Sequence, residues 1–123
     1  MNEDDKLKKL LEKKDCYILD ENKNSIPATI EEWSAFRSKE ENKIVKQDMI
    51  DNHLVSTVFI GIDSNYAWSK DYDPHKPHIF ETMVFTDNGY SDIYIDEYST
   101  YKEAEEGHLK AIQWVKDGCK DEY

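Results

Sequence analysis

Two imidazoles and a carboxylate lie within one short segment near the middle of the sequence. This segment, Asp73-Pro74-His75-Lys76-Pro77-His78, contains two prolines that stiffen it, and both histidines are expected to be accessible in a loop. Imidazole and carboxylate groups bind zinc, but a zinc site also needs further Cys or His ligands at a regular spacing. The sequence holds no second cluster of that kind. We therefore predict an ordinary loop here and no metal site.

Acid–base or metal chemistry is also open to three residues outside this loop: Asp63, Glu81 and His108. Glu81 is expected to lie opposite Asp96 in a hairpin, and such a like-charge pair raises a carboxyl pKa or attracts a cation. His108 belongs to an apolar helical stripe on the other side of the sheet, so no joint site with Glu81 is expected. A single His in such a stripe is typically a core residue bonded to a hydroxyl, here Thr82 or Ser56. We therefore assign no catalytic residue.

Nucleotide-binding and nucleophile motifs are absent from the sequence. The chain has four glycines and no G-x-x-x-x-G-K, G-x-G-x-x-G or nucleophile-elbow string. Nucleotide binding through those devices is therefore excluded, and no cofactor is predicted. A small-molecule, nucleotide or metal site of another kind, built from loop 64–78 and the strand ends, remains an alternative. Its candidate residues are Asp63, Glu81, His75, His78 and His108.

The dipeptide Asn88-Gly89 gives the clearest local signal, because Asn-Gly between two β-rich runs is the preferred two-residue hairpin turn. This turn predicts strands over 79–87 and 90–98, in which Val84 faces Ile93 and Met83 faces Tyr94. One face, expected under the last helix, then holds Phe80, Thr82, Val84, Ile93 and Ile95. The outward face holds a ladder of tyrosines and aspartates: Tyr90, Asp92, Tyr94, Asp96 and Tyr98.

Hydrophobic periodicity and capping patterns predict the other elements. The sequence favours a short strand over 16–19, a turn over 20–25, a hairpin of strands over 44–50 and 54–63, a long loop over 64–78, and helices over 29–41 and 100–118. The 54–63 strand is expected in the middle of the sheet. Gly107 lies inside the last helix, where a close backbone approach to the sheet would explain it.

These elements predict an α+β fold: an antiparallel sheet of about four strands with helices packed on one face. Residues 1–15 are expected to form an N-terminal helical appendage, 16–118 a single domain, and 119–123 a C-terminal tail. The chain of 123 residues is long enough for one ordinary domain.

Charge and composition restrict the class of partner. Sixteen basic and 27 acidic residues give a net charge of −11, which disfavours DNA, RNA or an anionic membrane as a partner. No apolar run approaches the length of a membrane span, and the first residues do not resemble a secretory signal. We therefore expect a cytoplasmic protein in which Cys16 and Cys119 are reduced and unpaired.

Negative charge is concentrated between residues 87 and 106, where seven acids accompany one lysine. Tyrosines offer rigid contact area and carboxylates attract a basic partner, so the ladder Tyr90, Asp92, Tyr94, Asp96 and Tyr98 is our candidate partner-binding surface. An ordinary solvated strand is the alternative, since Tyr favours strands and exposed acids keep small proteins soluble. Self-association through an exposed strand also stays open.

Three strings bear a family resemblance: Val55-Ser56-Thr57-Val58-Phe59-Ile60-Gly61-Ile62-Asp63, Phe80-Glu81-Thr82-Met83-Val84-Phe85, and Tyr98-Ser99-Thr100 through Glu103-Ala104 to Gly107-His108. Together they resemble a family of small, uncharacterised proteins encoded by bacteriophages and prophages, over roughly residues 54–112. The chain departs from that family in its longer loop at 64–78 and in Ser64, where relatives often carry His, which weakens a metal role for Asp63.

A phage setting implies a function by analogy. Small acidic phage proteins commonly bind a host component, so the resemblance implies a non-enzymatic protein that binds a host protein, such as a defence or nucleic-acid-handling factor, and inhibits it. A minor structural or assembly component of the phage is a further alternative.

Overall fold

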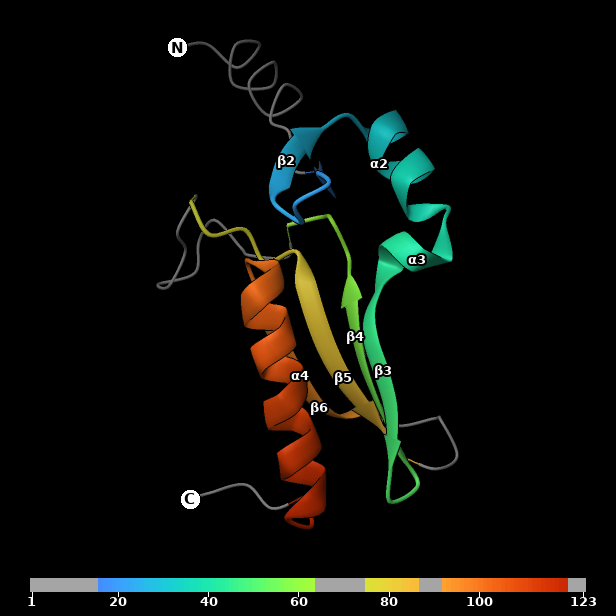
Figure 1. The fold of residues 1–123 in the computed structure, drawn as a ribbon, viewed down its shortest axis with the longest axis vertical. Helices are drawn as coiled ribbons and strands as arrows, with labels where there is room; N and C mark the ends of the chain where they lie inside the picture. The colour runs from blue at the N-terminus through green and yellow to red at the C-terminus, as the bar shows by residue number, and fades with distance from the viewer. Residues whose placement is uncertain (1–15, 64–74, 87–91, 120–123) are drawn as a thin grey trace, which may run out of the picture.

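A four-stranded antiparallel sheet carries one long helix across a single face (Figure 1). The computed structural model describes residues 16–63, 75–86 and 92–119, with Asp92 and Ile93 described by their backbone alone. The strands are β3 (Ile44–Ile50), β4 (His53–Phe59), β5 (Phe80–Phe85) and β6 (Asp92–Tyr98), in the order β3-β4-β5-β6. The predicted α+β class and antiparallel sheet are confirmed, with β4 in the interior of the sheet as expected. The predicted appendage over 1–15, most of the loop over 64–78, the Asn88-Gly89 turn and the last four residues lie outside the described residues.

A tight turn joins β3 to β4. Its two central residues, Asp51 and Asn52, have positive φ angles of 48° and 66°. This backbone conformation matches the right-handed twist of a hairpin, and Asp and Asn tolerate it better than most side chains do. The turn therefore sets the hairpin predicted from the sequence.

A smaller sheet lies at one end of the large one and contains β1 (Cys16–Leu19) and β2 (Ser25–Ala28). The Tyr17 N–H donates to the Gly61 carbonyl at 2.7 Å, and the Trp33 indole N–H donates to the Ile60 carbonyl at 2.8 Å. These bonds join the small sheet and the helix that follows it to the end of β4.

The predicted helix over 29–41 forms in two pieces, α2 (Ile30–Arg37) and α3 (Glu40–Lys43). The predicted capping box is confirmed. The Glu32 N–H donates to Thr29 Oγ1 at 3.1 Å, and the Thr29 N–H donates to Glu32 Oε1 at 2.9 Å. The helix breaks because Lys39 adopts an extended conformation.

The last helix, α4 (Tyr101–Lys116), covers the sheet. Thr100 caps it by accepting the Glu103 N–H at 3.1 Å, and Gly118 ends it with a φ of +86°. A Cβ atom at Gly107 would overlap the end of the Tyr98 ring, which confirms the close approach expected at this glycine. Within the part of the chain that the structure describes, no helix combines the length and hydropathy of a membrane span.

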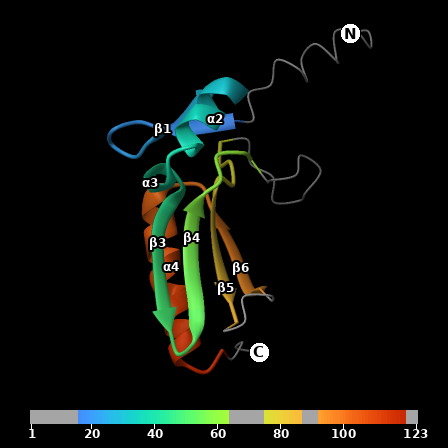
Figure 2. The same cartoon turned by 90° about the vertical axis from the view of Figure 1, so that its right-hand side faces the viewer.

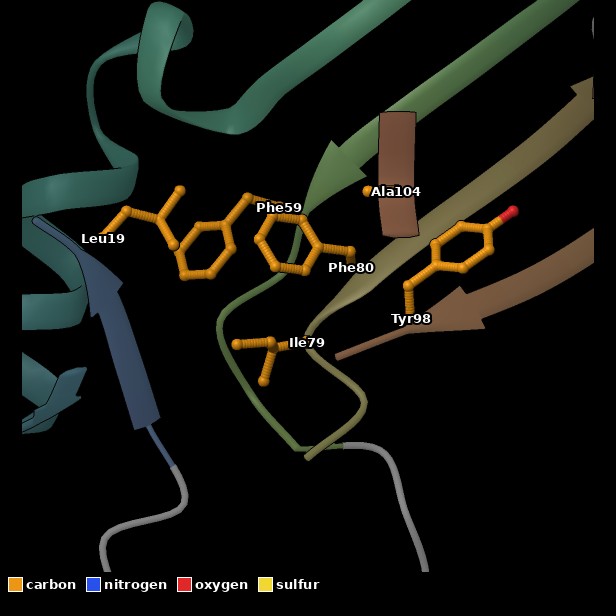
Figure 3. Close-up of a cluster of buried hydrophobic side chains, with 6 residues drawn as sticks. All are labelled: Leu19, Phe59, Ile79, Phe80, Tyr98 and Ala104. Atoms are coloured by element: carbon orange, nitrogen blue, oxygen red, sulfur yellow. The ribbon is translucent and has the colours of Figure 1, made fainter. Parts of the chain in front are cut away.

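Two apolar clusters fill the space between α4 and the sheet. The first contains Leu19, Phe59, Ile79, Phe80, Tyr98 and Ala104 (Figure 3). The second contains Val55, Val84, Ala111 and Val115, with the Tyr94 and Trp114 rings packed against it. Strands β4, β5 and β6 therefore each contribute side chains that pack against the apolar stripe of α4 that the sequence predicted.

The register of β5 with β6 differs from the predicted one by a single residue. Phe85 pairs with Asp92, as the tight turn predicts, but Val84 then pairs with Tyr94, so Ile93 is an extra residue in β6. A β-bulge of this kind turns every later side chain of the strand to the opposite face. The expected pairings of Val84 with Ile93, Met83 with Tyr94 and Glu81 with Asp96 are therefore wrong.

Candidate functional site

The inward side chains of β6 are the tyrosines, not the isoleucine. Tyr98 is buried in the first apolar cluster, and the Tyr94 ring lies 5.0 Å from the Trp114 ring of α4. Ile95, expected under the helix, is 56% exposed on the other face. The predicted outward orientation of Tyr94 and Tyr98 is therefore wrong. Asp96 remains exposed, whereas Tyr90 and the Asp92 side chain lie outside the described residues.

Burial also sets the chemistry of these tyrosines. Burial is the main cause that raises the pKa of both Tyr98 and Tyr94, and the negative charge of Asp96 adds to it. The Tyr98 hydroxyl has no hydrogen-bond partner in the described part of the chain. It points away from Phe80 in Figure 3. Both phenols are therefore neutral packing groups at physiological pH.

A chain of four hydrogen-bonding side chains crosses the core between the two apolar clusters. His108 of α4 approaches Asp48 Oδ2 of β3 with its Nε2 at 2.7 Å, and Thr57 Oγ1 of β4 with its Nδ1 at 2.7 Å. Thr57 Oγ1 in turn lies 2.5 Å from Thr82 Oγ1 of β5. His108, Thr57 and Thr82 are fully or almost fully buried, while Asp48 reaches the surface at the edge of the sheet.

The donor and acceptor in each of these hydrogen bonds follow from the Asp48 carboxylate. Because ionised Asp48 can only accept, His108 Nε2 donates to it. In the neutral imidazole Nδ1 then accepts from the Thr57 hydroxyl, which accepts from the Thr82 hydroxyl. The hydrogen bond from His108 is the largest influence on Asp48 and lowers its pKa below 3.8; burial opposes this effect, and the charge of Lys46 adds to it.

A carboxylate, an imidazole and a hydroxyl in this order are the parts of a hydrolase nucleophile. Here the Thr57 hydroxyl has no exposed surface, and the Thr82 hydroxyl occupies its remaining side. The adjoining cavity of about 110 Å³ reaches His108 but not Thr57. These hydrogen bonds therefore satisfy buried polar groups and hold α4 on the sheet. His108 is the core histidine that the sequence predicted, with Thr57 as its direct hydroxyl partner instead of Thr82 or Ser56.

The other face of the sheet carries apolar side chains in two adjoining rows. Met49, Leu54 and Phe85 are paired neighbours across β3, β4 and β5, and Met83 is paired with Ile95 in the next row. Figure 2 shows α4 behind β3 and β4, on the opposite side of the sheet. No described helix covers this second side. We call these five residues the open sheet face: Met49, Leu54, Met83, Phe85 and Ile95.

Acidic residues border the open sheet face. The next row along the strands contains Glu81 and Glu97, which are directly paired, so a like-charge pair does occur here, although Asp96 is not part of it. His78 lies beside them, with its ring Nδ1 3.0 Å from Glu97 Oε2. The backbone N–H of His78 donates to Asp63 Oδ1 at 2.9 Å. Glu81 and His108 lie on opposite faces of the sheet, as predicted.

These residues were also candidates for a metal or small-molecule site. His75 is exposed, and His78 is half-buried against Glu97. Within residues 16–63, 75–86 and 92–119, no three His, Cys, Asp or Glu side chains are arranged so that they could hold a metal ion. Neither Cys16 nor Cys119 forms a disulfide bond with a described residue. The structure therefore brings Asp63, His78, Glu81 and Glu97 into one neighbourhood and leaves His108 out of it.

Sequence reasoning missed Asp48, Thr57 and the open sheet face. Asp48 precedes His108 by 60 positions, so no local pattern connects them. A usable signal was the alternation in β3, which places Asp48 on the same face as the inward residues of the paired strand. The sequence did not predict Ile95 on the open sheet face, because the extra residue Ile93 reverses the orientation of Ile95.

Comparison of the chain with models of protein families, with curated proteins and with solved structures found no match.

Proposed function

We propose that the protein is a non-enzymatic binding protein whose open sheet face contacts a basic host protein in the bacterial cytoplasm. The observation that supports this most is the pair of apolar rows on a sheet face that no described helix covers. Met49 and Ile95 are exposed there, and the other three residues of this face are half-buried. A contiguous apolar patch with a polar border is typical of protein-binding surfaces. The resemblance to phage-encoded proteins supports a bacterial host as the source of the partner.

Charge complementarity favours a basic partner over a second copy of this chain. Glu81 and Glu97 border the apolar rows, and the whole chain carries a net charge of −11. A second copy would bring two strongly negative chains together, whereas a basic partner gains favourable electrostatic energy and associates faster at low salt. The partner is therefore expected to present apolar side chains surrounded by Lys and Arg.

Two matched double variants test this surface. Met49→Ser with Ile95→Ser removes two apolar side chains from the open sheet face, which are 64% and 56% exposed. Ile30→Ser with Leu109→Ser removes two side chains of similar exposure elsewhere, 61% and 62%. We expect a protein captured from a bacterial lysate, once purified, to bind the wild type and the Ile30/Leu109 variant equally. It should bind the Met49/Ile95 variant at least about tenfold more weakly, which corresponds to about 1.4 kcal/mol.

The salt dependence of binding and the oligomeric state of the protein distinguish a basic partner from a second copy of this chain. Binding to a basic protein should weaken as sodium chloride rises, because salt screens the border charges. Equal capture by both double variants, or capture that does not change with salt, would show that the proposed surface is wrong. A wild-type dimer in light scattering that only the Met49/Ile95 variant disrupts would assign the face to a second copy and overturn the host-protein proposal.

A further inference from the structure

A cavity of about 550 Å³ lies between the β1–β2 turn and the first turn of α4, away from the open sheet face. Its size lies within the range of about 300–1,000 Å³ that is typical of small-molecule sites. Most of its lining residues carry side chains that can form hydrogen bonds, and Phe80 and Tyr101 add aromatic surface. The lining includes Asn22, Lys23, Asn24, Ser99, Tyr101 and Lys102.

Both walls of this cavity are held in place by hydrogen bonds. On one side the Asp20 carboxylate accepts the N–H groups of Asn22 and Asn24 at 2.8 and 2.9 Å, which fixes the turn. On the other side the Thr100 cap fixes the start of α4. The Tyr101 ring packs edge-on against the buried Phe80 ring, with centroids 6.0 Å apart. The cavity is therefore formed before any ligand binds, which lowers the entropic cost of binding.

Two lysines give the cavity a positive side in a negatively charged protein. Lys23 Nζ lies 5.7 Å from the centroid of the Tyr101 ring, and Lys102 belongs to the same lining. Neither ammonium group forms an ion pair with a described residue. Glu105 is the acidic residue of the lining and disfavours a ligand that fills the whole cavity with negative charge. The lining therefore suits a ligand with one anionic group and an uncharged ring.

We propose that this cavity binds a nucleoside monophosphate. The phosphate contacts the ammonium groups of Lys23 and Lys102, and the base packs against the Tyr101 ring, since aromatic rings stack on bases regardless of sequence. The side chains of Asn22, Asn24 and Ser99 supply donors and acceptors for the base edge and the ribose. This site is independent of the open sheet face and differs from the motif-based nucleotide sites that the sequence excludes.

Calorimetric titration of the full chain tests the proposal with defined probes: adenosine, guanosine, cytidine and uridine monophosphates, inorganic phosphate and adenosine. We expect saturable binding of at least one monophosphate, and binding at least about tenfold weaker for inorganic phosphate and for adenosine alone. Absence of saturable binding of every monophosphate at millimolar concentration would overturn the proposal. Phosphate binding as tight as that of the monophosphates would show a simple anion site and would also overturn it.

Variants locate the binding. Lys23→Gln and Lys102→Gln should each weaken binding of the preferred monophosphate about tenfold, the loss of one charge-assisted hydrogen bond. Lys110→Gln, on the same helix but outside the lining, is the matched control and should bind as the wild type does. Equal affinity in Lys23→Gln, Lys102→Gln and Lys110→Gln would place the ligand elsewhere and refute the site. The Met49/Ile95 variant should keep its nucleotide affinity, so the two proposals fail separately.

Discussion

At the scale of single residues, His108 connects α4 to three strands with one side chain. It contacts Asp48 of β3 and Thr57 of β4 directly, and Thr82 of β5 through Thr57. The buried hydroxyl and imidazole groups of these side chains therefore all have partners, which avoids the cost of about 1–3 kcal/mol for an unsatisfied buried group. The His108 imidazole therefore holds α4 at one position on the sheet, between the two apolar clusters.

The Asp48 carboxylate should make stability depend on pH. Its pKa is lower in the folded chain than the usual 3.8, mainly because His108 donates to it. A carboxyl group of this kind stabilises the fold above its unfolded pKa, and the contribution is lost as pH falls through the folded value. In urea unfolding, the free energy of unfolding of wild type should exceed that of Asp48→Asn by a constant amount above about pH 5. This difference should shrink below about pH 4.

The matched control for this prediction is Glu106→Gln, an exposed carboxyl on α4. Its unfolding free energy relative to wild type should not follow the same pH profile. A gap between wild type and Asp48→Asn that persists unchanged to about pH 3 would show that the carboxylate form of Asp48 does not contribute.

Gly107 should resist replacement by Ala because of Tyr98. In a helix interior Ala is favoured over Gly by about 1 kcal/mol, but a Cβ here would overlap the Tyr98 ring. We expect Gly107→Ala to destabilise the wild type by about 1–3 kcal/mol in urea unfolding, the usual cost of overpacking. In a Tyr98→Ala background the same change should stabilise by up to about 1 kcal/mol. The same sign in both backgrounds would contradict the contact.

At the scale of elements, the bulge in β6 decides which side chains the sheet presents. Local signals predicted the helix starts at Thr29 and Thr100. They also predicted the β3–β4 hairpin and the inward set Phe80, Thr82 and Val84, because each depends on residues close in sequence. The bulge at Ile93 was not predicted, since the bulged and regular registers both satisfy the same turn dipeptide. Packing of Tyr98 against Gly107 requires the bulged register, and that contact is not local.

Deletion of Ile93 tests whether this residue is the extra one in β6. The shortened strand would still pair Tyr94 with Val84, now without a bulge, so Tyr94 and Tyr98 would still face α4. We expect the free energy of unfolding to fall by less than about 3 kcal/mol, because no core side chain changes face. Deletion of Met83 from the regularly paired strand β5 is the control; it turns core side chains of that strand to the other face and should cost more than about 3 kcal/mol. Equal losses in the two deletion variants would show that Ile93 is not an extra residue.

At the scale of the whole molecule, one sheet separates two different surfaces. The face under α4 is filled by two apolar clusters and the hydrogen-bonded chain between them, while the open sheet face keeps apolar rows next to Glu81 and Glu97. The fold class follows from the order of predicted elements. The pairing of Asp48 with His108 and the cavity between the β1–β2 turn and α4 do not, because each joins segments far apart in the sequence.

Net charge should make the folded state more stable as salt rises. A chain with a net charge of −11 repels itself more when compact than when unfolded, and raising salt from about 0.01 M to about 0.1 M shortens the screening length from about 30 Å to about 10 Å. We expect the thermal midpoint, followed by circular dichroism in sodium chloride, to rise by a few degrees over this range. Glu105→Gln with Glu106→Gln gives −11 + 2 = −9 and should reduce the rise, whereas Lys110→Gln gives −11 − 1 = −12 and should increase it. A midpoint that falls with salt would show that attractive surface pairs outweigh the repulsion. Because salt should weaken partner binding while it strengthens the fold, the two effects have opposite signs and can be measured on the same sample.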